Sequence, residues 1–109
     1  MRHNLSMRPH DIARAIENVL DEHPHGENIT PLRKIERLLR PLRGFTSYTD
    51  EMVETVQRTS NTFYGRTDLD SLGSDRQYRY ELLAAVHRLK NAISMMEDQL
   101  PKDIQVDIQ

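Results

Sequence analysis

The chain of 109 residues is 37% hydrophobic and 29% charged, with a formal net charge of −2 and no cysteine. This length accommodates one domain with one modest core, and the absence of cysteine excludes a disulfide framework and a thiolate metal site. No apolar run approaches the roughly 18 residues that span a membrane, and the first six residues lack the apolar stretch of a signal peptide. We therefore expect a single cytoplasmic domain, residues 1–109, that does not enter a membrane.

Residues 1–9 show no regular pattern and are expected to form a flexible arm. The first helix is predicted from about His10 to Glu22, because apolar residues recur at helical spacing at Ile12, Ile16, Val19 and Leu20. The sequence His-Pro-His-Gly at 23–26 then ends the helix, since proline and glycine break the pattern.

A second helix should begin at Thr30 and Pro31, because proline suits the first helical turn. Its apolar stripe consists of Ile35, Leu38, Leu39 and Leu42. Pro41 and Gly44 end this helix.

The third helix is predicted to begin near Ser47 or Thr49 and to continue through Phe63, with acidic residues in its first turn. Gly65 and the polar residues 66–74 are expected to form a loop.

The last helix has the clearest pattern of the chain. Its apolar residues are spaced 4, 3, 4, 3 and 4 apart and form a seam of Leu82, Val86, Leu89, Ile93, Met96 and Leu100. Such a seam suits an antiparallel helical bundle or a helix pair across a dimer interface. Pro101 closes the helix, and the tail 101–109 alternates over 104–108 in the manner of a short strand.

These segments together predict an all-α fold, a small antiparallel helical bundle of three to four helices with a long C-terminal helix. The low hydrophobic fraction implies narrow apolar stripes on these helices. Chains of this kind often complete their core by association. A homodimer is therefore expected to complete the bundle.

One segment of the last helix, His87-Arg88-Leu89-Lys90-Asn91-Ala92, is similar to the phosphoacceptor helix of histidine phosphotransfer domains. In that interpretation the His87 imidazole is the nucleophile and Lys90 is the cation that holds the phosphoryl oxygens. Those domains commonly have glycine where this chain has Asn91, and an ordinary polar residue on a solvated face is the favoured interpretation of His87.

Other chemistry finds little support in the sequence. His23 and His25 flank a proline and could meet His10, but no further ligand lies at a spacing that completes a metal site. The four glycines form no phosphate-binding loop. We therefore predict no enzyme activity, no cofactor and no metal.

The second helix is rich in positive charge. Its basic residues are Arg33, Lys34, Arg37, Arg40 and Arg43, with Glu36 among them. A solvated helix face is the favoured explanation, because a net acidic chain has no general attraction for nucleic acid.

Tyr78 and Tyr80, with Arg76 and Arg79 beside them, open the last helix ahead of its seam. Tyrosine and arginine are frequent anchors of protein interfaces, because each buries a large area and carries a polar tip. These four residues are the predicted partner-binding site. The alternative is that a tyrosine simply covers the end of the bundle.

Two segments of the chain resemble a known family. Residues 39–46 read L-R-P-L-R-G-F-T, and residues 77–80 read Q-Y-R-Y ahead of an alanine-rich helix and Leu100-Pro101-Lys102. They are similar, the second with a one-residue offset, to L-R-P-L-x-G-L-T and Q-x-x-R-Y of the TraM antiactivators. These small helical dimers bind LuxR-type quorum-sensing regulators and prevent them from engaging DNA.

The resemblance implies a regulatory protein that inhibits such a regulator by binding it, and it implies that Tyr80, the tyrosine of the R-Y pair, contributes to this binding. The stretch between the two segments is shorter than in the family, and the N-terminal helix has no counterpart there.

Overall fold

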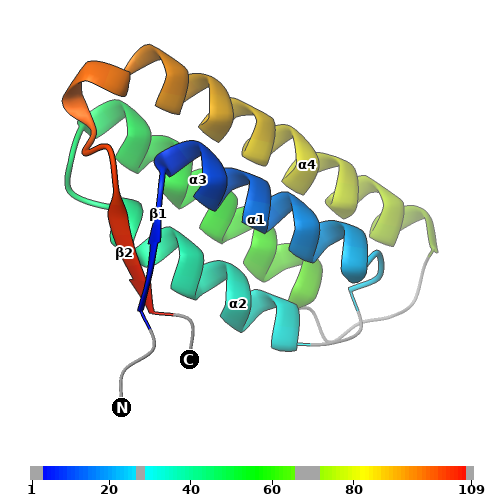
Figure 1. Cartoon of the computed structure of the whole chain (residues 1–109). Coiled ribbons are helices and arrows are strands. Elements are labelled where there is room, and N and C mark those ends of the chain that lie inside the picture. The colour runs from blue at the N-terminus through cyan, green and yellow to red at the C-terminus, as the bar shows by residue number, and fades with distance from the viewer. Residues whose placement is uncertain (1–3, 27–28, 66–71, 108–109) are drawn as a thin grey trace.

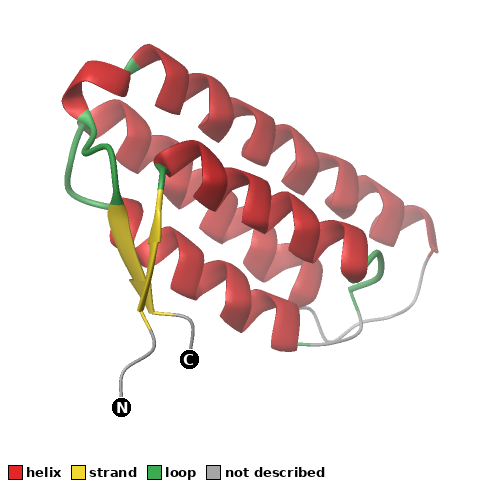
Figure 2. Ribbon diagram, viewed as in Figure 1, coloured by secondary structure: helices red, strands yellow, loops and turns green. Residues whose placement is uncertain are grey.

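The computed structural model describes residues 4–26, 29–65 and 72–107. Four α-helices make up most of the molecule (Figure 2). They are α1 (Pro9–Glu22), α2 (Thr30–Leu39), α3 (Ser47–Tyr64) and α4 (Leu72–Met95). Two short 3-10 helices, η1 (Arg40–Leu42) and η2 (Glu97–Gln99), and two strands, β1 (Asn4–Met7) and β2 (Ile104–Asp107), complete the described elements.

The helices form an antiparallel bundle in which each helix contacts two others. The contacting pairs are α1 with α2, α2 with α3, α3 with α4, and α4 with α1. Each of these pairs runs antiparallel, so α2 and α4 lie diagonally opposite each other (Figure 1). The prediction of an all-α bundle with a long C-terminal helix is confirmed, and no helix in the described part of the chain is long and apolar enough to cross a membrane.

The seam of α4 lies in the core of this bundle. Leu82, Val86, Leu89 and Ile93 are each no more than 1% exposed, and Met96 is partly buried against the same core. The seam therefore packs within the bundle of one chain, which is one of the two arrangements that the sequence predicted; the other was a helix pair across a dimer interface. The expected dimer stays a prediction from composition.

The end of α4 differs from the predicted one. The helix stops at Met95, and η2 follows before Leu100, which is extended (φ −103°, ψ 147°) but still buried. Pro101 explains the extended backbone of Leu100, because a residue before proline is disfavoured in the helical region. Two residues of the predicted seam, Met96 and Leu100, thus join the core from outside the helix.

The start of α4 also differs. Residues 66–74 were expected to form a loop, but the helix begins at Leu72, and residues 66–71 lie outside the described part of the chain. Asp75 lies in the first helical turn, where a carboxylate complements the helix dipole. Its Oδ1 also accepts a hydrogen bond from the Gly26 amide at 3.3 Å, so a contact with a distant loop supports this turn.

The expectation of a flexible N-terminal arm was wrong for Asn4–Met7 and for Pro9. Residues 4–7 form β1, which pairs antiparallel with β2, so that Leu5 lies opposite Val106. The predicted strand in the tail is confirmed over Ile104–Asp107. Ile104 and Val106 are 5% and 1% exposed, so one face of β2 is buried, and β1 supplies its backbone hydrogen bonds.

Candidate partner-binding surface

The four residues predicted to bind a partner divide into two pairs. Tyr78 is partly buried and packs against the hydrophobic core. Arg79 is partly buried too, and its Nη2 donates a hydrogen bond to the Leu20 carbonyl oxygen of α1 at 3.4 Å. These two partly buried side chains attach α4 to the bundle.

Tyr80 and Arg76 face outward. Tyr80 is 70% exposed and Arg76 is also exposed. Their spacing of four residues places them on the same helical face. Of the four residues predicted to bind a partner, this pair is the exposed one, and partner binding itself stays a prediction.

Two more residues continue the same face toward the C-terminus of α4. Leu83, three residues after Tyr80, is 38% exposed, and His87, four residues further, is exposed. We call Arg76, Tyr80, Leu83 and His87 the exposed stripe of α4. It brings the predicted anchor and the alternative phosphoacceptor onto one surface.

The spacing of the seam would have been enough to distinguish the partly buried pair, Tyr78 and Arg79, from the exposed pair. Counting back four and three residues from Leu82 gives Tyr78 and Arg79, which therefore belong to the buried face. Leu83 was missed as a candidate site residue although it lies off the seam. An exposed leucine between an exposed tyrosine and an exposed histidine is the signal that would have identified it.

The surroundings of His87 and Lys90 bear on the phosphotransfer interpretation. His87 has no hydrogen-bond partner among the described residues. Lys90 Nζ lies 3.1 Å from Glu17 Oε1 of α1 and forms an ion pair with it. The cation proposed for phosphoryl oxygens is therefore already paired with a carboxylate.

A polar cluster at the start of α4 supports the exposed stripe. The Tyr64 hydroxyl donates to the His23 carbonyl oxygen at 2.7 Å, and His25 Nδ1 lies 3.5 Å from Asp75 Oδ2. Burial raises the pKa of Tyr64 to about 12, while Arg79 lowers it and Asp75 raises it further. These contacts connect the α1–α2 loop with α3 and with the first turn of α4. They hold in place the part of α4 that precedes Tyr80.

The histidines considered as metal ligands make other contacts. His10 Nε2 lies 3.3 Å from Ser94 Oγ, and His25 is beside Asp75. Within residues 4–26, 29–65 and 72–107, no group of three or more histidine, aspartate or glutamate side chains could hold a metal ion.

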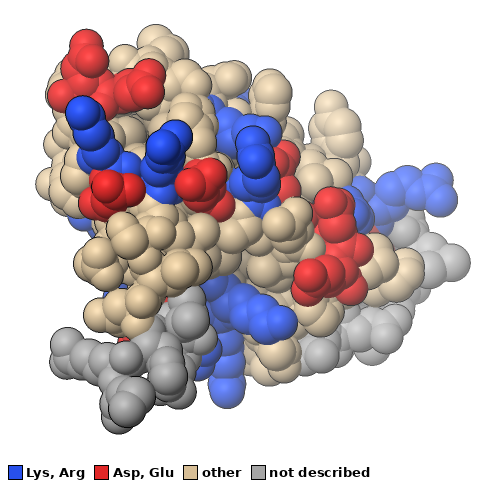
Figure 3. Space-filling model, in the orientation of Figure 1, with Lys and Arg blue, Asp and Glu red and all other residues tan. Residues whose placement is uncertain are grey.

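Charges of both signs are interleaved on the face of the molecule drawn in Figure 3, which carries α1. A mixed surface produces no strong field of one sign, so electrostatic attraction for a polyanion is not favoured on this face.

Comparison of the chain with protein-family models, with curated proteins and with solved structures finds no match. The resemblance to the TraM antiactivators thus rests on its two segments, which lie at opposite ends of the bundle (Figure 1).

The first of these segments has a clear structural role. Its leucines, Leu39 and Leu42, are at most 1% exposed, and Gly44 adopts a positive φ of 94° that favours glycine. Thr46 then caps α3 by accepting a hydrogen bond from the Thr49 amide at 3.0 Å. The leucines, glycine and threonine of the L-R-P-L-R-G-F-T segment are therefore explained by the turn between α2 and α3, whereas its Phe45 is 41% exposed. The Q-Y-R-Y segment supplies the more exposed aromatic residue, Tyr80.

Proposed function

We propose that this chain is a non-enzymatic cytoplasmic regulatory protein that binds and inhibits a protein partner through the exposed stripe of α4. The observation that carries the proposal is Tyr80, whose side chain is 70% exposed on a helix whose opposite face is fully buried. Exposed large aromatic side chains on rigid elements are typical anchors of protein interfaces.

The composition of the stripe supports this proposal. Leu83 adds apolar area beside Tyr80, and Arg76 adds a planar cation one turn away. Tyrosine and arginine are enriched among residues that dominate interface energies. The stripe therefore has the chemistry of a small interface centred on Tyr80.

The resemblance to the TraM antiactivators suggests the class of partner. A LuxR-type transcriptional regulator is the proposed target, and the inhibitory effect is stoichiometric because the chain acts by occupying a surface. Tyr80 is the position at which the resemblance and the exposed stripe coincide.

Histidine phosphotransfer through His87 is the second candidate. Its supporting observation is an exposed imidazole without a partner among the described residues. The ion pair of Lys90 with Glu17 weighs against it, since a paired ammonium is less available to phosphoryl oxygens.

The test measures binding of a LuxR-type regulator from the native host to the purified chain and to three variants. Tyr80→Ala should weaken binding about thirtyfold, the effect of losing roughly 2 kcal/mol at an interface anchor. His87→Ala should change affinity little, because it lies at the far end of the stripe. Met95→Ala is the matched control, since Met95 is 69% exposed on the same helix but about 22 Å further along it.

Circular dichroism must first show that all variants are folded. Equal weakening by Tyr80→Ala and Met95→Ala would contradict a binding site centred on Tyr80. Incubation with a phosphorylated response regulator distinguishes the second candidate, which requires an acid-labile phosphate that His87→Ala abolishes.

A further inference from the structure

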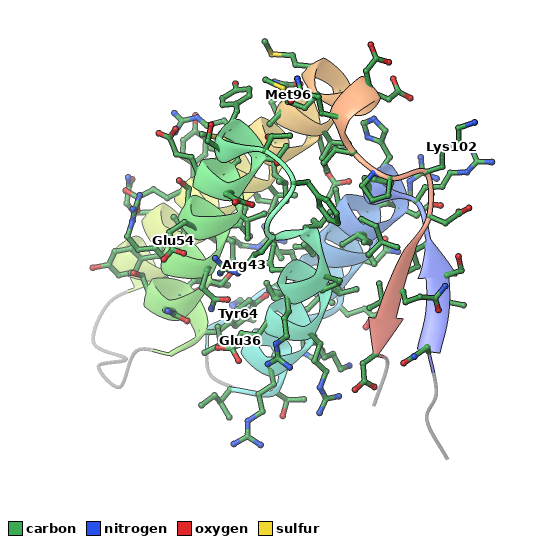
Figure 4. The ribbon with its side chains drawn as sticks, turned by 90° about the vertical axis from the view of Figure 1, so that its left-hand side faces the viewer. Glu36, Arg43, Glu54, Tyr64, Met96 and Lys102 are labelled. Atoms are coloured by element: carbon green, nitrogen blue, oxygen red, sulfur yellow. The ribbon has the colours of Figure 1, made fainter. Side chains whose placement is uncertain are left out.

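β1 is the outer strand of the small sheet. It pairs with β2, and β2 in turn contacts α2 and η1. Figure 4 shows the same order, with β2 between α2 and β1 and with β1 at the outside. In the described part of the chain, β1 makes its main contacts with β2, and no strand pairs with its other edge. We call this other edge of β1 the free edge of the sheet.

The backbone of β1 has hydrogen-bonding groups to offer at this edge. Within residues 4–26, 29–65 and 72–107, the backbone hydrogen bonds of Asn4–Met7 are those of its pairing with β2. In an antiparallel pair, alternate residues direct their amide and carbonyl groups away from the partner strand. Asn4, Leu5 and Ser6 are exposed, so such groups can pair with another strand.

The sequence of β1 does not protect the free edge. Edge strands that avoid association commonly carry a charged residue, a proline or a bulge. β1 reads Asn-Leu-Ser-Met, which contains no charge and no proline, and its four residues pair with β2 in continuous register. An edge of this kind favours pairing with a further strand.

The inner face of the sheet is apolar and extends to the free edge. Leu5 lies opposite Val106, and Met7 lies opposite Ile104, so these four side chains share one face. Val106 and Ile104 are buried, whereas Leu5 is 48% exposed at the border of the face. A strand added beside β1 would extend this apolar face and cover Leu5.

We propose that a second copy of this chain supplies that strand, and that the two β1 strands pair antiparallel about a twofold axis at Ser6 to form a four-stranded sheet. In this register Leu5 lies opposite Met7 of the partner subunit, so apolar residues meet on the inner face. Pairing of one strand with its own copy is self-complementary, as the twofold interface of a homodimer requires.

The outer face of the sheet fits the same register. Arg8 continues β1 in an extended conformation (φ −75°, ψ 153°), and it shares the outer face with Asn4 and Ser6. With the axis at Ser6, Arg8 lies opposite Asn4 of the partner subunit, so no like charges oppose each other. An axis at Leu5 would pair only residues 4–6 of the described strand, whereas an axis at Ser6 pairs residues 4–8.

The composition of β1 favours its own copy over a strand of another protein. Its four residues carry no charge that would select an acidic or a basic strand, and its alternating apolar and polar residues match themselves. The low hydrophobic fraction of the chain, 37%, also predicts a homodimer. None of the residues in this pairing belongs to the exposed stripe of α4, so the dimer can be tested independently of the proposed function.

The first test is the mass of the full chain in solution, measured by sedimentation equilibrium. A short strand pair buries less than the standard interface of about 800 Å² on each side, so we expect a dimer that dissociates in about the micromolar range. A monomer mass at a chain concentration of about 500 μM would overturn the proposal.

Charge variants at the axis test the register. Ser6→Lys and Ser6→Glu each place like charges opposite each other, so each should raise the dissociation constant of the dimer about fivefold or more. A mixture of the two variants should form the dimer again, because opposite charges then meet at the axis. Ser6 is exposed, so the fold should persist, and circular dichroism checks this.

Gln105→Lys and Gln105→Glu are the matched controls. Gln105 lies opposite Ser6 on β2 and is exposed on the same face of the sheet. In the proposed dimer the two copies of Gln105 are three strand spacings apart, about 14 Å, where salt screens their charges. These variants should therefore dimerise as the parent chain does.

A cysteine at the axis provides a second measurement. The chain has no cysteine, and directly opposite residues of an antiparallel pair have Cα atoms about 4.5 to 5.5 Å apart, within the range of a disulfide. On mild oxidation, Ser6→Cys should therefore form a covalent dimer much faster than Gln105→Cys. Equal rates, a Lys and Glu mixture that stays monomeric, equal weakening by the Gln105 variants, or a dimer that both Ser6 charge variants leave unchanged would each refute pairing through β1.

Discussion

The two faces of α4 have opposite environments although they share one helix. Leu89, on the inner face, is fully buried, whereas Tyr80 on the outer face is 70% exposed. The inner face stabilises the bundle through apolar burial, which requires only suitable size and spacing. The outer face contributes little to the core, and its exposed side chains Tyr80 and Leu83 support the partner-binding site that we propose.

The comparison is sharpest where the same change is made on each face. A charge placed on the inner face must be buried, and the same charge on the outer face remains in water. Variants of α4 can therefore test whether its two faces differ as the structure indicates, and the expected effects run from several kcal/mol to a fraction of one.

The largest effect is expected from Leu89→Glu. This change removes a large apolar contact and buries a carboxylate, so the free energy of unfolding should fall by at least about 4 kcal/mol. Asn91→Glu is the control, because Asn91 is exposed two residues away and should change stability by less than about 0.5 kcal/mol. Thermal unfolding followed by circular dichroism measures both. Similar melting temperatures for the two variants would show that α4 does not pack through its seam.

A smaller effect is expected where α4 begins, at the contact of α3 with the α1–α2 loop. Tyr64→Phe removes the hydroxyl that donates to the His23 carbonyl oxygen, and it should cost about 1 kcal/mol because that part-buried acceptor loses its partner. Urea unfolding at neutral pH measures this loss. Tyr64 is 2% exposed, so the phenyl ring that remains should fill the same space.

The same variant also predicts a pH dependence. The pKa of Tyr64 is raised from 10.0 to about 12 in the folded chain, mainly by burial, so the folded state holds this proton more tightly than the unfolded state. The resulting stability is fully present below pH 10 and is lost as pH rises toward 12. The difference in stability between the parent and Tyr64→Phe should therefore shrink over this range. A difference that does not change with pH would contradict burial of the hydroxyl.

Local periodicity was sufficient to predict the helices and the inner face of α4. The spacing of Leu82, Val86 and Leu89 predicts which face of the helix is buried, and these three residues are buried in the structure. The same rule, extended one turn back, would have placed Tyr78 inside and left Tyr80 outside. That part of the site was accessible to sequence reasoning.

Contacts between distant parts of the chain were not accessible in this way. β1 is a strand because Leu5 lies opposite Val106, about a hundred residues away, and four residues alone show too short a pattern to predict it. Leu72 begins a helix beside Gly73, a poor helix former, and the contact of Asp75 with Gly26 helps to hold this turn. The free edge of β1 likewise depends on the pairing of its other edge with β2.

The smallest change in stability is expected at the boundary between the two faces of α4. Lys90 Nζ there lies 3.1 Å from Glu17 Oε1. Both side chains are more than a third exposed, and pairs of this kind typically contribute between about 0 and 1 kcal/mol. Lys90→Met keeps the aliphatic length but removes the charge, so it should lower stability by less than about 1 kcal/mol at low salt.

Salt and a second substitution distinguish an ion pair from simple packing at Lys90. The loss in Lys90→Met should disappear in about 1 M NaCl, because the Debye length falls to about 3 Å there. A double-mutant cycle should show that Lys90→Met has little effect once Glu17→Gln is present, because both substitutions remove the same ion pair. A loss above about 2 kcal/mol at both salt concentrations would mean that Lys90 belongs to the buried face by its packing. The inner face of α4 would then be wider than the seam, and the outer face would begin only at His87 and Asn91.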